Sequence, residues 1–362
     1  MERQINPKNS SSSLSRAKEF FYREWFFFLA LIFFMATSLI TGHYPSYSRD
    51  EYEVLWILAI FFVVIRGMEK SGLLHAVASR FEKRSANATL LLIATFLISC
   101  FVTNDIALLV MVPITLQLAI DRKELLVILE AVTSNAAALL PSSTPQNLFI
   151  YWHYQLRLGE FMLTIAPFVV GVFLFALFLA RIYPITVTPK NLEVPIYKRS
   201  LAYLFFFALV LLAIFKVVPL YLAGIVLLYV LFFDPDALKI DYLLLAVFYL
   251  FFGIADNLST ILAHQLHHPH AVFLLAVGLS QLMSNVPATV LLADFTSDWQ
   301  SLLWGVSVGG YGILWGSLAN IIAYRLYVAK YTESFTFLKR FLQVNFLALL
   351  FGTLLYYAFR FI

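Results

Sequence analysis

Two short runs of polar residues interrupt apolar stretches of the sequence, and their side chains could bind ions. Thr103-Asn104-Asp105 forms the first run and Ser284-Asn285 the second. Hydroxyl and amide groups offer oxygen ligands to Na⁺ and hydrogen-bond donors to an anion. Asp105 is the acid that lies deepest in an apolar stretch, where an ionisable group is costly and by default functional. We therefore expect Asp105 to carry a proton or to bind Na⁺.

The alternative is that these residues only cap helices, since Ser, Thr, Asn and Asp are preferred N-caps. Pro287 suits the first turn of a helix that begins at Ser284-Asn285. However, a serine precedes each run by about one turn, Ser99 in the first case and Ser280 in the second. Capping does not require this recurrence, so we expect both runs to bind ions as well.

Two longer apolar segments contain residues that break helices. In Pro141-Ser142-Ser143-Thr144-Pro145-Gln146-Asn147, two prolines remove backbone donors and favour extended geometry before each ring. In Gly309-Gly310-Tyr311-Gly312, which continues to Ser317 and Asn320, glycines loosen the helix instead. The carbonyl groups freed at such breaks need partners. These partners are a bound ion or, alternatively, neighbouring helices around a simple kink.

The composition indicates that these segments lie in lipid. Of the 362 residues, 61% are hydrophobic and 13% are charged, which excludes a water-soluble globule and a disordered chain. The net charge of +4 fits basic loops on one side of a membrane better than a nucleic-acid partner. We find no phosphate-binding loop, and we expect no cofactor and no ATP-driven pump.

Apolar runs of roughly 20 residues cross a bilayer as helices. We predict such spans over 24–42, 53–68, 161–182, 201–216, 217–233, 242–256 and 341–361, and interrupted helices over 125–152 and 302–324. Most of the 25 lysines and arginines then fall on one side, which is the cytoplasm by the positive-inside rule. We expect a multi-pass protein of the plasma membrane (the bacterial inner membrane) with a cytoplasmic N-terminus and no removable signal peptide.

Segments 87–120 and 271–295 each divide into two apolar arms around a polar tip. An arm of about 15 residues rises only about 22 Å as a helix, which is less than the hydrocarbon core of roughly 30 Å. We therefore predict two re-entrant hairpins. Irregular backbone at membrane depth must be buried in protein or line a water-filled cavity, so the tips should do one or the other.

The hairpins and the interrupted helices form an internal repeat. Thr103-Asn104 aligns with Ser284-Asn285, and the run Ser143 to Asn147 aligns with Ser317-Leu318-Ala319-Asn320-Ile321. The charge pattern has the first hairpin entered from the cytoplasm and the second from outside, so the two halves are inverted. Inverted repeats with interrupted helices place a binding site near the bilayer midplane.

The predicted fold class is an all-α polytopic membrane protein with inverted structural repeats, each with a re-entrant helical hairpin and a broken transmembrane helix. The predicted order is a cytoplasmic tail (1–23), a first span with an outside loop (24–52), repeat 1 (53–182), a cytoplasmic linker with two spans (183–241), the core of repeat 2 (242–330) and a linker with the last span (331–362).

Three runs together resemble motifs of the ion transporter superfamily: Val102-Thr103-Asn104-Asp105, the run Ser143 to Asn147, and Ser284-Asn285-Val286-Pro287-Ala288-Thr289. The nearest match is the bacterial citrate-transporter-like anion permeases, relatives of divalent anion/Na⁺ symporters, arsenite permeases and one type of Na⁺/H⁺ antiporter. The resemblance covers roughly residues 50 to 360. It implies an elevator-type carrier, usually a homodimer, that is coupled to Na⁺ or H⁺.

The resemblance also implies site residues by position. One Na⁺ site would comprise Ser99, Thr103, Asn104 and Ser143, and a mirror site Ser280, Ser284, Asn285 and Ser317. The substrate would lie between the tips, at Thr103, Asn104, Thr144, Ser284 and Asn285. Ion coupling would involve Ser99, Asp105, Ser143, Asn147, Ser280, Ser317 and Asn320.

The sequence departs from the family pattern in three places, since Asp105 and Val286 replace the third tip residue and Leu318-Ala319 replaces Thr-Pro. A carboxylate beside the site repels a dianion unless it is protonated or bound to a cation. These departures bring the chain nearer to the arsenite and antiporter branches of the superfamily.

The sequence thus favours an ion-coupled secondary transporter of a small anion, a carboxylate or an inorganic oxyanion, and not an enzyme. The alternative is a Na⁺/H⁺ antiporter or an arsenite exporter of the same superfamily. A membrane-embedded hydrolase is a remote alternative, because Gly305-Val306-Ser307-Val308-Gly309 fits the G-x-S-x-G pattern of nucleophile elbows.

Overall fold

The computed structural model describes residues 25–42, 44–74, 76, 87–183, 185–188, 199–261, 268–331 and 334–360. These residues are mostly helical, and the strands among them are a two-residue antiparallel pair, β1 (Ala119–Ile120) and β2 (Val187–Thr188). The all-α fold class predicted from the sequence is confirmed. The predicted tail 1–23 lies outside the described residues.

A helix lies at each single span that the sequence predicts. These helices are α2 (Trp25–Thr41), α3 (Arg49–Lys70), α9 (Leu158–Ile182), α10 (Arg199–Ile214), α11 (Ile225–Phe233), α12 (Tyr242–Ile261) and α17 (Ser334–Arg360). Among the described residues, three segments are long and apolar enough to cross a membrane by length and composition: Leu158–Ile182, Pro235–Leu258 and Phe335–Phe359. Many large apolar side chains on these helices are exposed, among them Leu163, Phe178 and Leu354. Such a surface is stable in lipid.

The predicted span 217–233 begins later than the apolar pattern suggests. Lys216 adopts a positive φ of 62° and Pro219 an extended conformation, so the chain turns before the 3₁₀-helix η2 (Leu220–Gly224) leads into α11. A second 3₁₀-helix, η3 (Pro235–Leu238), then precedes α12. Proline and the left-handed turn, which hydropathy does not register, set these boundaries.

Each predicted hairpin is a pair of short helices with a tight turn. The first consists of α5 (Ala88–Phe101) and α6 (Asn104–Gln117), and the second of α13 (Pro269–Met283) and α14 (Asn285–Ala293). Val102 and Thr103 form the first turn, whereas Ser284 alone forms the second. Ser284 has a φ of 75° and a ψ of 156°, a conformation that residues with a side chain rarely adopt and that requires support from neighbouring structure.

Each interrupted helix consists of two α-helices with a 3₁₀ turn between them. The first comprises α7 (Lys123–Ala136), η1 (Pro141–Ser143) and α8 (Pro145–His153). The second comprises α15 (Trp299–Gly309), η4 (Leu314–Gly316) and α16 (Leu318–Val328). The proline-containing and glycine-containing segments therefore break their helices where the sequence predicts.

The helix caps correct the alignment of the two breaks by one residue. Thr144 is the N-cap of α8 and Ser317 the N-cap of α16, so Ser317 corresponds to Thr144 and not to Ser143. Three residues into each helix, Asn147 corresponds to Asn320 and not to Ile321. The predicted alignment was wrong because it matched serine to serine, whereas the position of the cap determines which residues are equivalent.

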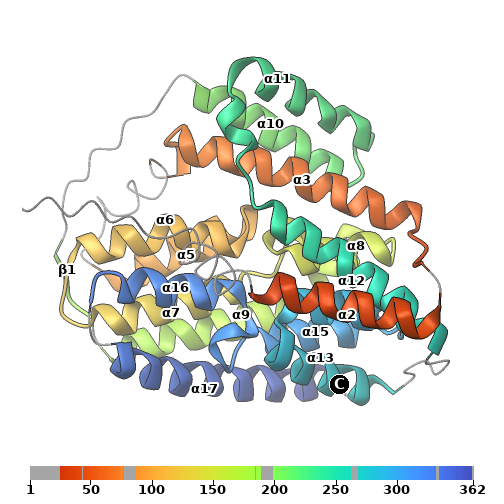
Figure 1. The fold of residues 1–362 in the computed structure, drawn as a ribbon. Helices are drawn as coiled ribbons and strands as arrows, with labels where there is room; N and C mark the ends of the chain where they lie inside the picture. The colour runs from red at the N-terminus through yellow and green to blue at the C-terminus, as the bar shows by residue number, and fades with distance from the viewer. Residues whose placement is uncertain are drawn as a thin grey trace, which may run out of the picture.

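Figure 1 shows α3, α10 and α11 grouped along one side and α17 along the opposite side, with the hairpins and interrupted helices between them. Within this middle layer the second arm of each hairpin packs against the interrupted helix of the other half, α6 on α16 and α14 on α8. The two halves of the sequence therefore interlock, and the polar breaks lie inside the protein.

Candidate functional site

Asn135, at the end of α7, is the centre of a buried polar network. Its Oδ1 accepts hydrogen bonds from Asn104 Nδ2 at 3.0 Å and from Ser317 Oγ at 2.9 Å. Its Nδ2 donates to Asn320 Oδ1 at 2.8 Å. One side chain therefore connects the tip of the first hairpin to the break of the second interrupted helix.

Ser134 connects the same tip to α5. Its hydroxyl donates to the backbone carbonyl of Asn104 at 2.9 Å, and it lies 2.8 Å from Ser99 Oγ. Because the Ser134 proton is used by Asn104, Ser99 donates to Ser134. All four oxygen-bearing residues of the predicted first Na⁺ site are buried, namely Ser99, Thr103, Asn104 and Ser143. Neutral oxygens of this kind suit a hard cation such as Na⁺.

The first break is stabilised by its own side chains. Thr144 Oγ1 accepts from the Asn147 backbone N–H at 3.3 Å, and Asn147 Nδ2 donates to the Ala138 carbonyl at 3.1 Å and to Ser143 Oγ at 3.4 Å. Ser143 Oγ donates to the Leu140 carbonyl at 2.6 Å. Ser143, Thr144 and Asn147 therefore bond to groups within the break itself, whereas Asn147 Oδ1 and Ser142 Oγ are buried without a partner among the described residues. The fourth member of the predicted Na⁺ site, Ser143, thus has its partners within the break.

In the second half, Gln281 makes three side-chain hydrogen bonds to the backbone of the break. Gln281 Nε2 donates to the carbonyls of Gly309 at 2.7 Å and Tyr311 at 2.9 Å, and its Oε1 accepts from the Ile313 N–H at 3.0 Å. Asn320 Nδ2 donates to the Gly310 carbonyl at 2.9 Å. Gln281 therefore attaches the second hairpin to the second break.

The predicted mirror Na⁺ site is less closely connected. Ser280 Oγ donates to the Ala276 carbonyl of its own helix at 2.7 Å. Ser284 Oγ lies 3.5 Å from both Asn285 Oδ1 and the Gly316 carbonyl, at the limit of a hydrogen bond. Ser317 bonds instead to Asn135 of the first half. The two halves therefore differ in detail where the sequence predicts equivalent sites.

A cavity of about 730 Å³ lies beside this network. Four helices place residues of their first turns in its wall: Asp105 from α6, Pro145 from α8, Val286 and Pro287 from α14, and Leu318 from α16. Thr144 caps α8, but the N-cap residues of α6, α14 and α16 make no side-chain cap hydrogen bond. The N-terminal turns of four helices thus border one space, and their positive partial charges favour an anion there.

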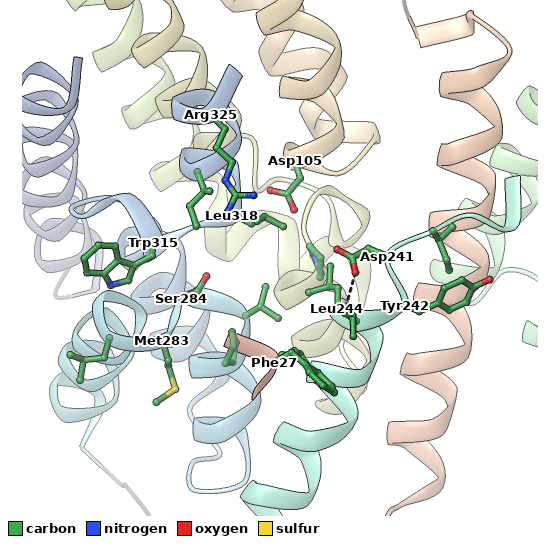
Figure 2. Close-up of a pocket in the computed structure, with 18 of the residues that line it drawn as sticks. Phe27, Asp105, Asp241, Tyr242, Leu244, Met283, Ser284, Trp315, Leu318 and Arg325 are labelled. Carbon is green, nitrogen blue, oxygen red and sulfur yellow. Dashed lines mark hydrogen bonds between the residues drawn. The ribbon is translucent and has the colours of Figure 1, made fainter. Parts of the chain in front are cut away.

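The charged residues that line the cavity are Asp105, Lys239, Asp241 and Arg325. Figure 2 shows the carboxylate of Asp105 and the guanidinium of Arg325 pointing toward each other from α6 and α16, and Ser284 facing the same space. Asp105 Oδ1 is shielded from solvent and has no hydrogen-bond partner among the residues that the structure describes. The buried acid predicted from the sequence therefore lies at the cavity wall.

The predicted site residues divide into two groups. Ser284 and Asp105 line the cavity. The predicted substrate ligands Thr103, Asn104, Thr144 and Asn285 are at most 4% exposed, and their neighbours Asp105, Pro145 and Val286 face the cavity instead. The predicted coupling residues other than Asp105 lie behind the wall and form the hydrogen bonds described above: Ser99, Ser143, Asn147, Ser280, Ser317 and Asn320.

Four residues of this region were not predicted. Ser134 and Asn135 form a polar pair at the end of an apolar helix, a signal as strong as the hairpin tips. Gln281 is an amide one residue after Ser280 within an apolar arm. The sequence assigns Arg325 only to the cytoplasmic side, because a single arginine near a helix end belongs to no binding motif.

The G-x-S-x-G segment has a packing role. It lies within α15 and not at a strand-to-helix turn, so it is not a nucleophile elbow. A Cβ at Gly305 would meet Ala276 Cβ at 2.6 Å, and one at Gly309 would meet Ser280 Cβ at 2.5 Å. Glycines four residues apart let α15 approach α13 closely, as in membrane helix pairs. The G-x-S-x-G pattern therefore gives the remote hydrolase alternative no support.

The sequence of this chain is similar to one protein family and to two individual proteins. A family model described as "Citrate transporter" matches residues 21–309. The chain is 31% identical over 296 residues to the uncharacterized transporter MJ0456 of Methanocaldococcus jannaschii, an alignment that covers 76% of this chain and 81% of the relative. It is also 31% identical over 306 residues to the inner membrane protein YbiR of Escherichia coli, covering 76% of this chain and 80% of the relative.

Proposed function

This chain belongs to the citrate transporter family, and from that premise we propose that it moves a small anion, a carboxylate or an inorganic oxyanion, across the membrane together with Na⁺ or H⁺. The family and the name of the archaeal relative identify a secondary transporter, so the chain is a carrier and not an enzyme. As a multi-pass membrane protein it contacts the lipid bilayer and a small substrate. We assign it to the plasma membrane with its N-terminus in the cytoplasm, following the distribution of basic residues.

The observation that carries the choice of an anion is the convergence of helix N-termini on the cavity. The first turns of α6, α8, α14 and α16 all contribute to its wall. Among the described residues, the N-caps of α14 and α16 make no side-chain cap hydrogen bond, whereas in α6 the Asp105 N–H donates to Asn104 Oδ1. Uncapped N–H groups together with the helix dipoles stabilise negative charge. The volume of about 730 Å³ accommodates an anion of the size of citrate together with water.

Two features support coupling to a cation. Ser99, Ser134 and Asn104 bring neutral oxygens together behind the cavity wall, which suits Na⁺. Asp105 places a carboxylate at the wall itself, and such a group can carry H⁺ or bind Na⁺. A bound cation at either place would offset the repulsion between Asp105 and an anionic substrate.

We further propose that the two halves are inverted repeats that work by elevator-type alternating access, and that the protein is a homodimer, as the family resemblance implies. The reciprocal packing of α6 on α16 and of α14 on α8 supports this view of the halves. In such a carrier the hairpins and interrupted helices would move together against the other helices.

Uptake into proteoliposomes tests the proposal. Purified protein should accumulate labelled citrate, succinate, sulfate or phosphate when an inward Na⁺ or H⁺ gradient is imposed, and Asp105→Asn should abolish the dependence on that gradient. If Asp105→Asn left uptake and its pH and Na⁺ dependence unchanged, the coupling role of Asp105 would be refuted.

A Na⁺/H⁺ antiporter is the second candidate, and the unpartnered Oδ1 of Asp105 at the cavity wall favours it. An arsenite exporter belongs to the same alternative. A pH-sensitive dye in everted vesicles distinguishes these functions: Na⁺ added alone dissipates the pH gradient only for an antiporter, whereas arsenite does so only for a proton-coupled exporter.

A further inference from the structure

Arg325 is an exposed cation in the cavity wall, and it forms no ion pair with any side chain of the described structure. It lies in the last turn of α16, and Leu318, Ile321 and Arg325 line the cavity together. Their spacing places them on one face of the helix. Because side chains of a helix incline toward its N-terminus, Arg325 extends back along α16 toward the helix N-termini that surround the cavity. Figure 2 shows its guanidinium pointing into this space.

The other charged groups of the wall are already engaged. Lys239 Nζ lies 2.6 Å from Asp236 Oδ1, in an ion pair on the protein surface. Asp241 Oδ1 accepts a hydrogen bond from the Leu244 N–H at 3.0 Å, at the start of α12. Arg325 and Asp105 are left facing each other, and no ion pair joins them in the described structure.

We propose that Arg325 is the residue that binds the anionic group of the substrate, and that the carboxylate of Asp105 competes with the substrate for it. This inference rests on the proposed function and assigns a residue to it. A guanidinium presents paired N–H donors that match a carboxylate or an oxyanion bidentately. An anion held between Arg325 and the uncapped helices α14 and α16 is bound from two sides, as a selective site requires.

A structural role for Arg325 makes a different prediction. A basic residue near a helix C-terminus also stabilises the helix dipole, and such a residue contributes equally with and without substrate. Under that alternative, substitution would lower stability but leave anion affinity unchanged. Anion affinity and unliganded stability must therefore be measured on the same variants.

The test is the affinity of purified protein for citrate, sulfate and phosphate, obtained from the rise in melting temperature as each anion is titrated. We expect Arg325→Gln to weaken binding of the bound anion by at least about tenfold, as loss of a charge-assisted hydrogen bond does. Arg325→Lys should weaken it less, since it retains the charge but not the paired donors. Asp105→Asn should strengthen binding severalfold, but not in the Arg325→Gln background.

Arg181→Gln is the matched control, because Arg181 is an exposed arginine in the last turn of α9 and lies away from the cavity. It should leave affinity unchanged. Wild-type affinity in Arg325→Gln would overturn the inference while leaving the proposed function intact. If wild-type protein bound none of the anions, the proposed function would fail and this inference with it. If Arg325→Gln did not fold, Arg325→Lys decides, and wild-type affinity in that variant would overturn the inference.

Discussion

Asn135 donates a hydrogen bond from Nδ2 to Oδ1 of Asn320 over 2.8 Å, and this bond joins the two interrupted helices directly. Both side chains are buried, and Asn135 also accepts bonds from the first hairpin tip and from Ser317. Two separate, mirror-related polar sites would be independent of each other. The observed network is shared, so the two breaks are hydrogen-bonded to each other and to the first hairpin tip.

The first prediction concerns the strength of this shared network. Asn135→Ala removes three hydrogen bonds and leaves Asn104, Ser317 and Asn320 without that partner. Since interhelical hydrogen bonds in membrane proteins contribute about 0.6 kcal/mol each on average, we expect a loss of about 2 kcal/mol in the free energy of unfolding. Denaturant titration in detergent, followed by tryptophan fluorescence, measures this loss.

Asn345→Ala is the control for the loss of a buried asparagine. Asn345 Nδ2 donates one bond, to the Phe341 carbonyl of its own helix at 3.1 Å. This variant should lose well under half as much stability as Asn135→Ala. Equal losses in the two variants would mean that the bonds between the halves contribute nothing beyond ordinary burial of an amide.

The second prediction concerns the close packing of α13 on α15. A Cβ at Gly309 would lie 2.5 Å from Ser280 Cβ and 3.2 Å from the Val277 Cα, so the helices would have to separate. Such overpacking costs about 1–3 kcal/mol. We expect Gly309→Ala to lower the melting temperature and to weaken the bonds that Gln281 makes to the second break.

Gly278→Ala, on the opposing helix α13, provides the comparison. A Cβ at Gly278 would meet no atom of the described residues within 4 Å. Alanine is favoured over glycine in a helix by about 1 kcal/mol, so this variant should be as stable as the wild type or slightly more stable. If the two alanine variants changed the melting temperature in the same direction, close packing at Gly309 would not be the cause.

The third prediction is a loss of stability in acid that depends on His153, the last residue of α8, just beyond the predicted span 125–152. Burial lowers the pKa of its imidazole, and the charge of Asp50 opposes this only in part. The carboxylate of Asp294 is 3.9 Å away, too far for a hydrogen bond to a charged imidazole. The folded protein therefore favours neutral His153.

Because the pKa in the folded state lies below the unfolded value of about 6.5, this contribution to stability is complete above that pH and is lost as the pH falls through the lower folded value. As the pH falls from 7.5 to 5, the melting temperature of His153→Gln should rise relative to that of wild type, because the variant lacks this contribution. His268→Gln, which changes an exposed histidine, should follow the wild-type profile. A His153→Gln profile equal to the wild type would exclude His153 as the source.

The sequence predicts the elements of this fold well because local chemistry determines them. Apolar arms too short to span, with Thr103-Asn104 or Ser284-Asn285 between them, form the two hairpins. The prolines at 141 and 145 and the glycines from 309 to 312 end their helices at the predicted places. Each of these signals acts within a few residues of itself.

The roles of individual side chains could not be predicted in the same way. Whether Asn104 or Asp105 faces the cavity depends on the rotation of α6 about its axis, which packing against α16 determines. The partnership of Asn135 with Ser317 joins residues far apart in the chain and leaves no local pattern. Position in the fold, and not residue type, separates the residues that line the cavity from those behind it.

The last prediction tests where the cavity opens and which tip residue it reaches. The sequence contains a single cysteine, Cys100, which is 4% exposed, so maleimide labelling of an introduced cysteine can be measured with little contribution from Cys100. Ser284 lines the cavity, and Lys239 and Arg325, assigned to the cytoplasmic side by the charge pattern, line it too. A membrane-impermeant maleimide should therefore label Ser284→Cys faster in inside-out than in right-side-out vesicles.

Asn285→Cys is the control for this labelling, because Asn285 is the next residue but is only 4% exposed, and it should remain unlabelled. Equal labelling of the two variants would place the second tip differently from Figure 2, and faster labelling from outside would reverse the proposed orientation of the cavity.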